Sequence, residues 1–255
     1  MAVALKTDTP TLRSRVSDSE WQARVDLAAA YRLLAHFKWT DGTATHISAA
    51  VPDEHGAFLI NPHGMLFHEV TASSLVKIDL DGNVLLDTGW PVNKAGFVIH
   101  SAIHKGREDI NCVIHTHTRA GIAVSAMKCG MLMISQHALR FYNRLGYHDF
   151  AGIACDLEER ESLVRDLGPH KALILRNHGL IGCGTSMAEA FSVIQYLERI
   201  CESQIAAMSG GAELTYPSPE ICERTAKQYD TELIPERGWT AHKRMLDQMD
   251  PGYAS

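Results

Sequence analysis

Two histidines stand two positions apart at the end of an apolar run. The run reads Val113-Ile114-His115-Thr116-His117-Thr118, and its β-branched residues favour a buried strand. Alternate residues of a strand point to the same face, about 7 Å apart at the backbone, so both imidazoles can reach one cation. Because neutral imidazole nitrogens bind Zn²⁺ at about 2.0–2.1 Å, this pattern indicates a metal site.

A third histidine follows a second apolar run, Ile174-Leu175-Arg176-Asn177-His178-Gly179. His178 comes at the end of an expected buried strand, and Gly179 permits a tight backbone beside it. Three histidine ligands leave one coordination position of the metal for water or substrate. This arrangement is typical of a catalytic metal site rather than of a structural one, in which all ligands come from the protein. A set of hydrogen-bonded histidines beside a sheet edge is the alternative.

The elements that would position these histidines alternate between strands and helices, after a first part that indicates antiparallel sheet. An apolar stripe predicts a helix over 18–38, with Asp18 or Ser19 as its N-cap. The turn Asp81-Gly82-Asn83 favours a hairpin. Expected strands cover 46–51, 57–61, 75–80, 84–86, 111–117, 172–176 and 180–183. Further helices are expected over 95–105, 119–127, 156–167 and 186–208, the last two capped by Asp156 and Ser186.

This order of elements predicts a single α/β domain with three layers, α/β/α, around a central, mainly antiparallel sheet. The chain shows no internal repeat and no linker long enough to separate two domains. We expect a mobile N-terminal segment over 1–16, the domain over 17–210, and a helical C-terminal extension over 211–255 that packs on the domain.

Composition disfavours several classes of function. The 255 residues are 45% hydrophobic, which suits a sizeable core and excludes general disorder. With 24 Lys and Arg against 30 Asp and Glu, no basic excess is left for phosphates, so no nucleic-acid partner is expected. No apolar window approaches 18 residues, so no membrane span is expected. The start lacks a secretory signal and the six cysteines form no CxxC pair, which favours a reducing, cytoplasmic location.

The order of the motifs resembles the class II aldolase/adducin family, whose members include L-fuculose-phosphate aldolase. After 115–118 come Arg176-Asn177-His178-Gly179-Leu180 and Ala188-Glu189-Ala190-Phe191, and the resemblance covers roughly residues 20 to 208. It implies the family's fold, a small-molecule substrate, and a homotetramer with sites near subunit interfaces. It also implies one divalent ion per chain, with Zn²⁺ favoured over Mn²⁺, Co²⁺ or Fe²⁺. The residues carried over as its ligands are His115, His117 and His178.

The resemblance also implies where a substrate would bind. His46 and His63 lie on the two turns that form the substrate pocket in the family. Lys94 offers a cation to a carboxylate or a phosphate. The candidate substrate-binding residues are Thr43, His46, Asn61, His63, Gly64 and Lys94.

The chain departs from the sugar-phosphate aldolases at their acid/base position. Those enzymes carry a proton-shuttling glutamate about nineteen residues before the first metal histidine, where this chain has Gly96. No Asp or Glu occurs between Asp87 and Glu108, so no small shift of alignment supplies one. We therefore expect little cleavage of sugar phosphates, and His137 is the candidate proton donor.

Three functions remain open at this point. The first is a divalent-metal lyase that cleaves or decarboxylates a small hydroxy- or keto-carbonyl compound, with the metal stabilising the enolate. The second is an epimerase that uses the same metal. The third is an adducin-like binding protein that keeps the fold without the chemistry. The three histidines favour the enzymes, and the missing glutamate favours the binding protein.

Overall fold

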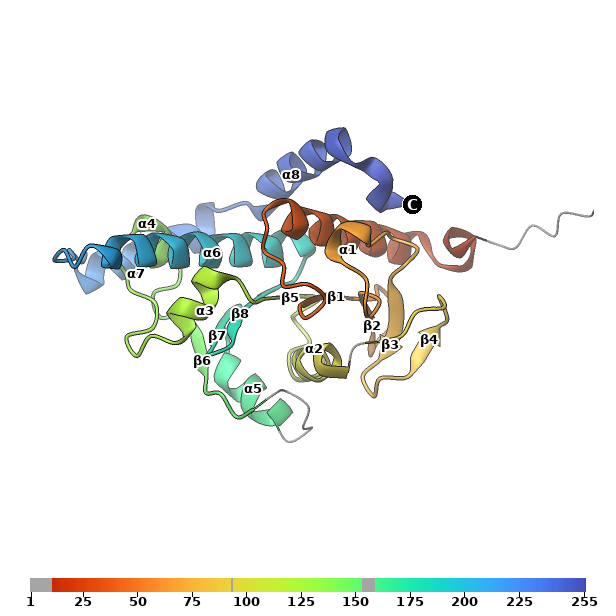
Figure 1. Cartoon of the computed structure of the whole chain (residues 1–255), viewed down its shortest axis with the longest axis horizontal. Coiled ribbons are helices and arrows are strands. Elements are labelled where there is room, and N and C mark those ends of the chain that lie inside the picture. The colour runs from red at the N-terminus through yellow and green to blue at the C-terminus, as the bar shows by residue number, and fades with distance from the viewer. Residues whose placement is uncertain (1–10, 93, 153–158) are drawn as a thin grey trace, which may run out of the picture.

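The computed structural model describes residues 11–92, 94–152 and 159–255, which form one eight-stranded sheet between two layers of helices (Figure 1). The strand order is β4-β3-β2-β1-β5-β8-β7-β6, and every neighbouring pair is antiparallel except β6 and β7. The predicted three-layer α/β fold with a mainly antiparallel sheet is confirmed. The strands are β1 (His46–Ala50), β2 (Ala57–Ile60), β3 (Val76–Asp79), β4 (Val84–Leu86), β5 (Cys112–Thr116), β6 (Gly146–His148), β7 (Ala172–Leu175) and β8 (Gly179–Gly184).

Helices cover both faces of the sheet. In Figure 1, α1 and α6 lie above it, and α2 and α5 lie below it. The α-helices are α1 (Asp18–His36), α2 (Lys94–Gly106), α3 (Arg119–Ser125), α4 (Gln136–Leu139), α5 (Glu159–Leu167), α6 (Met187–Ser209), α7 (Pro219–Glu232) and α8 (Pro235–Met249). Short 3-10 helices are η1 (Leu12–Arg15), η2 (Phe67–Glu69) and η3 (Pro251–Ala254).

Strand β5 lies at the centre and contributes to a core on each side. Ile114 packs in the cluster formed with α1 and α6, whereas Val113 packs in the cluster formed with α2 and α5. Because side chains alternate along a strand, His115 shares the α2 side with Val113, and Thr116 shares the α6 side with Ile114. Burial on both faces explains why this strand begins with three consecutive apolar residues, Cys112, Val113 and Ile114.

The helix N-caps were only partly predictable. Ser186 caps α6 as predicted, because its side chain accepts a hydrogen bond from the backbone of Glu189. The cap of α1 is Ser17, not Asp18 or Ser19, since the extended backbone of Ser17 lets its hydroxyl accept from the backbone N–H of Glu20. The predicted cap Asp156 lies outside the described residues.

Two short elements, β6 and α4, were not predicted. They contain three and four residues, too few to show a period in the sequence. The helix predicted over 119–127 ends earlier, at Ser125. The C-terminal residues, predicted as a helical extension, contain the regular helices α7 and α8.

Helix α8 and the chain end pack on the α1 side of the molecule. Trp239 and Leu246 of α8 are buried in the same core cluster as the α1 and α6 side chains. Asp250 accepts a hydrogen bond from Arg32 at 2.6 Å, and a second ion pair joins Lys243 to Asp26 at 2.7 Å. The boundaries at 16/17 and 210/211, and the mobility of the first segment, stay predictions.

None of the helices among the described residues is both long and apolar enough to cross a bilayer. The cysteines at 112, 129, 183, 201 and 222 are free thiols. Cys155 lies outside the described residues.

Candidate metal centre

The three histidines of the predicted metal site converge at one end of the β5–β8 pair. His115 is on β5, His117 lies just beyond its end, and His178 ends the turn between β7 and β8. The pairing of Thr116 with Leu180 brings this turn to the end of β5. Within the turn Asn177 has a left-handed φ of +57°, which asparagine tolerates better than most residues.

The ligand atoms lie close enough together for one ion. The Nε2 atom of His117 is 2.8 Å from Nε2 of His115 and 2.8 Å from Nε2 of His178. Ligand atoms of all three residues, hereafter the histidine triad, lie within 4.8 Å of one another. Nitrogens bound tetrahedrally to Zn²⁺ at about 2.0–2.1 Å are roughly 3.3 Å apart, so an ion fits after a small separation of the rings.

Hydrogen bonds on the far side of two rings aim their Nε2 atoms at the centre. The Nδ1–H of His115 donates to the Leu180 carbonyl at 3.0 Å, and the Nδ1–H of His117 donates to an Asp41 carboxylate oxygen at 3.1 Å. Each bond fixes the tautomer and leaves the Nε2 lone pair free. This is the usual support for a metal-bound histidine.

Burial keeps two histidines of the triad in their neutral, metal-binding form. It lowers the pKa of His115 well below the ordinary histidine value, and the neighbouring histidines lower that pKa further. Burial also lowers the pKa of His178 to about 4, with smaller contributions from His117 and His148. Both rings are therefore uncharged near pH 7 and able to donate a lone pair.

Replacing Asp41 with alanine is expected to weaken metal binding about 10- to 100-fold, because His117 loses the partner that orients its ring. A competition titration with a chromogenic chelator measures the affinity. Glu202→Ala also removes one exposed carboxylate, from α6, and serves as the control. Equal affinities of the two variants would contradict a supporting role for Asp41, a residue that the sequence analysis did not single out as a site residue.

A buried glutamate supports the triad from the opposite face of the sheet. Glu198 on α6 accepts hydrogen bonds from the hydroxyls of Thr116 and Thr118, each at 2.5 Å. These threonines alternate with His115 and His117 along the chain. The two hydrogen bonds to Glu198 therefore hold in place the strand end that carries both ligands. Burial raises the pKa of Glu198 to about 7. Glu198 was not predicted as a site residue, although a glutamate within the apolar stripe of α6 is a signal visible in the sequence.

Glu198→Gln is expected to change how stability depends on pH. A carboxyl with a folded-state pKa near 7 and an unfolded value of 4.5 stabilises the fold most at low pH. That contribution is lost as the pH rises through about 7. Urea unfolding at about pH 5 and pH 7.5 should therefore show a loss on the order of 2 kcal/mol in wild type that the glutamine variant lacks. Parallel pH profiles of the two proteins would refute this role, and Glu161→Gln, at an exposed position on α5, is the control.

Two of the predicted substrate-binding residues, Thr43 and His46, lie on segments that contact the triad. Thr43 belongs to the turn that contains Asp41, the carboxylate bonded to His117. His46 is buried, pairs with His115 across β1 and β5, and has its ring centroid 5.1 Å from that of His115.

The other substrate-binding candidates have different surroundings. Asn61 is buried, and its side-chain oxygen accepts a hydrogen bond from the Tyr31 hydroxyl at 2.9 Å. His63 and Gly64 are exposed in the following turn, and no contact between described residues joins them to the triad. The side chain of Lys94 lies outside the described part of the structure.

The position of the missing glutamate is filled by a histidine ring. A Cβ atom on Gly96 would lie 2.7 Å from Cδ2 and 2.9 Å from Cγ of His46, so only glycine fits beside this ring. The candidate donor His137 lies on α4, where its ring packs against Tyr196 at 5.4 Å. Among the described contacts, none joins His137 to the triad of the same chain.

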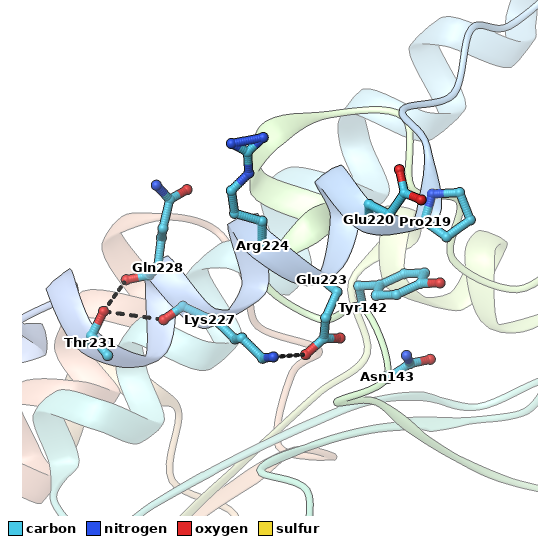
Figure 2. Close-up of a pocket in the computed structure, with 9 residues that line it drawn as sticks. All are labelled: Tyr142, Asn143, Pro219, Glu220, Glu223, Arg224, Lys227, Gln228 and Thr231. Carbon is cyan, nitrogen blue, oxygen red and sulfur yellow. Dashed lines mark hydrogen bonds and ion pairs between the residues drawn. The ribbon is translucent and has the colours of Figure 1, made fainter.

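A groove on the surface of α7 is separate from the triad (Figure 2). Its lining includes Tyr142 and Asn143 and contains no histidine. Lys227 pairs with Glu223 of the same helix, and the Thr231 hydroxyl donates to backbone carbonyls of α7. These contacts are those of a solvated helix face. A small cavity lined by His148, Phe150 and His178 lies directly beside the triad instead.

Residues 25–205 match the family model described as the Class II Aldolase and Adducin N-terminal domain. The chain belongs to the class II aldolase and adducin family. This confirms the resemblance that the motifs indicated, and the triad contains the three histidines that the family motif marks in this chain.

Relatives of this chain include proteins named as aldolases and proteins named as adducins. A Caulobacter vibrioides protein, provisionally named as an aldolase class 2 protein, is 48% identical over 249 residues, which cover 96% of this chain and 97% of that protein. Alpha-adducin of Rattus norvegicus is 47% identical over 216 residues, which cover 80% of this chain but only 29% of the adducin.

Solved structures of the class II aldolase family match the whole fold. The crystal structure of an aldolase II superfamily protein from Pseudomonas syringae has a TM-score of 0.93 and 49% identity, and the match covers 96% of this chain and 100% of that one. An L-fuculose 1-phosphate aldolase from Glaciozyma antarctica has a TM-score of 0.82 and 25% identity, with 92% of each chain covered.

Proposed function

We propose that the protein is a divalent-metal-dependent lyase that cleaves or decarboxylates a small hydroxy- or keto-carbonyl compound. The observation that carries the proposal is the convergence of three Nε2 atoms, two of them oriented by hydrogen bonds to Leu180 and Asp41. A purely structural role would not require three buried or half-buried imidazoles to direct their lone pairs to one point.

His115, His117 and His178 would hold the ion, and the all-imidazole donor set favours Zn²⁺, with Mn²⁺, Co²⁺ and Fe²⁺ as alternatives. A divalent ion bound there would act as a Lewis acid on the substrate carbonyl and stabilise the negative charge that bond cleavage leaves. Asp41 holds the His117 ring in place through its Nδ1–H.

The remaining roles belong to the residues around the triad. Thr43 and His46 would contact the substrate, and Asn61, His63 and Gly64 would contribute to the same pocket. Lys94 would attract a carboxylate, which favours an acid as the substrate. Gly96 supplies no proton, so His137 of a neighbouring subunit is the candidate donor in a homotetramer. We further propose that the protein is cytoplasmic.

Two other functions are supported by specific observations. An epimerase of the same family would use the same triad. An adducin-like binding protein is supported by the 47% identity with alpha-adducin, together with the glycine at position 96. A binding protein would show no turnover of any substrate with metal present.

The test is a panel of substrates assayed with added Zn²⁺, Mn²⁺ or Co²⁺. Hydroxy- and keto-acids are expected to be turned over, and His178→Ala should abolish this turnover. Fuculose, rhamnulose and ribulose phosphates should react about 10²- to 10⁴-fold more slowly than in an enzyme with a general acid/base at position 96. Brisk cleavage of a sugar phosphate would overturn the proposed substrate class. Loss of every activity with metal bound would favour the binding protein.

A further inference from the structure

The half-buried side chain of Arg140 is anchored on helix α6. Arg140 directly follows α4, and its Nη1 atom donates to the backbone carbonyl and to the hydroxyl of Ser192, each at 3.0 Å. The guanidinium carbon also lies 4.7 Å from the centre of the Tyr196 ring, which is a cation–π contact. These contacts hold the guanidinium group in one orientation.

The anchored guanidinium keeps three N–H groups without a protein acceptor. Among the described residues, none accepts a hydrogen bond from Nε or from Nη2 of Arg140. Both atoms remain accessible, since neither belongs to the fully buried side-chain atoms that lack a partner. Nε and Nη2 form a planar pair of donors, and this pair matches the two oxygens of a carboxylate.

The space beside Arg140 is a cavity of about 400 Å³, hereafter the α6–α7 cavity. It lies between α6, the residues 169–171 before β7, and the segment that joins α7 to α8, and Figure 1 shows α4, α6 and α7 together at the left of the molecule. Its volume is typical of small-molecule sites. Val193, Tyr229 and Leu233 form an apolar part of the wall, and no residue of the triad lines the cavity.

The lining of the cavity contains three permanent cations but only two carboxylates. Lys171 pairs with Glu189 at 2.5 Å, and Arg144 pairs with Asp230 at 2.9 Å. Arg144 also pairs with a glutamate of α7 outside the lining, and that glutamate has a lysine of α7 as its second partner. Among the described residues, no carboxylate forms an ion pair with Arg140. The lining therefore has one cation without a counter-ion.

This uncompensated charge favours the binding of an anion. Burial lowers the pKa of Arg140, and nearby tyrosines and carboxylates offset that effect only in part. Arginine nevertheless stays protonated at pH 7, so the charge is permanent. Burial also lowers the pKa of His170 in the lining, so this ring adds no charge near pH 7. A single negative charge on a ligand would balance the lining.

We propose that the α6–α7 cavity is a second ligand site, which binds a small monocarboxylic acid with an apolar body. The carboxylate accepts hydrogen bonds from Nε and Nη2 of Arg140, and the apolar part lies against Val193, Tyr229 and Leu233. The single uncompensated cation favours a monocarboxylate over a phosphate or a dicarboxylate. Binding requires neither the triad nor a metal ion, so the site is independent of the proposed lyase activity.

The proposal is tested with para-fluorobenzoate and para-fluorobenzamide, which have nearly the same shape, although only the benzoate is charged. Fluorine NMR titrations measure both dissociation constants. The benzoate is expected to bind the wild-type protein about 10- to 100-fold more tightly, because a hydrogen bond between charged groups contributes more than a neutral one. Equal affinities, or no binding of the benzoate up to about 10 mM, would overturn the proposal.

Variants of Arg140 assign the preference to this side chain. Arg140→Gln should remove it, so that both ligands bind equally weakly. Arg140→Lys keeps the charge without the planar pair of donors, and it should retain only part of the preference. Arg199→Gln removes an exposed arginine from α6 and should behave as wild type. Thermal unfolding shows that each variant is folded. An unchanged preference in both Arg140 variants would contradict the proposed site.

The position of the ligand is tested without any substitution in crystals of the wild-type protein soaked with para-iodobenzoate, because iodine gives an anomalous signal. A peak is expected in the α6–α7 cavity, with the carboxylate on Nε and Nη2 of Arg140. Iodine found only at other places would overturn the proposal. His178→Ala should bind para-fluorobenzoate as tightly as wild type, since no triad residue lines the cavity. Loss of binding in His178→Ala would place the ligand at the triad instead.

Discussion

His178→Ala is expected to reduce the bound metal from one ion per chain to nearly none. The three Nε2 atoms supply the whole protein part of the proposed coordination, and His178 comes from the turn between β7 and β8, whereas the other two ligands come from the end of β5. Without His178 the ion would have only two protein ligands, His115 and His117, and two ligands are too few for tight Zn²⁺ binding. Metal analysis of protein dialysed against micromolar zinc measures the effect.

The control for this experiment is His55→Ala, because His55 is an exposed histidine on the turn after β1. It should retain the metal content of wild type. His117→Ala provides a second variant within the triad and should also lose the ion. Stoichiometric metal in both triad variants would show that the ion binds elsewhere and would remove the basis of the proposed function.

Gly179→Ala is expected to destabilise the protein by about 3 kcal/mol and to weaken metal binding. A Cβ at this position would lie 2.3 Å from the Thr116 carbonyl oxygen and 3.2 Å from Cδ2 of His117. The clashing atom is backbone in the middle of the sheet, so relief requires β8 to move away from β5. That movement separates His178 from His117. Thermal unfolding and the chelator titration measure the two consequences.

Gly210→Ala is the matched control for the glycine. Gly210 follows α6 with a φ of −91°, and a Cβ there would have no neighbour within 4 Å. Its replacement should leave both the melting temperature and the metal affinity close to those of wild type. Equal effects of the two substitutions would mean that the close approach of β8 to β5 does not position the triad.

The sequence by itself determined the parts of the molecule that depend on local periodicity. Residues 112–116 form a strand because an apolar, β-branched run is extended, and the period of two then places His115 and His117 on the same side. The long helix after Ser186 and the hairpin at Asp81-Gly82-Asn83 follow from equally local signals, a cap and a turn. The sequence showed that Gly96 stands where related aldolases have a glutamate. It did not show why a glycine is needed there, which is the close approach of the His46 ring.

Tertiary structure alone decided which distant groups meet. The sheet order places β1 and β8 on either side of β5, so Asp41 and His178 reach His117 from separate segments. The same order brings His46 against His115 and lines up Ser48 with two histidines of α2. Such contacts join residues 50 to 80 positions apart. The periodicity of apolar residues and the residue types of turns predict only local structure, so they cannot predict these contacts. The burial that lowers the pKa of His115 and of His178 is likewise a property of the packed layers, because desolvation depends on what surrounds a ring in space.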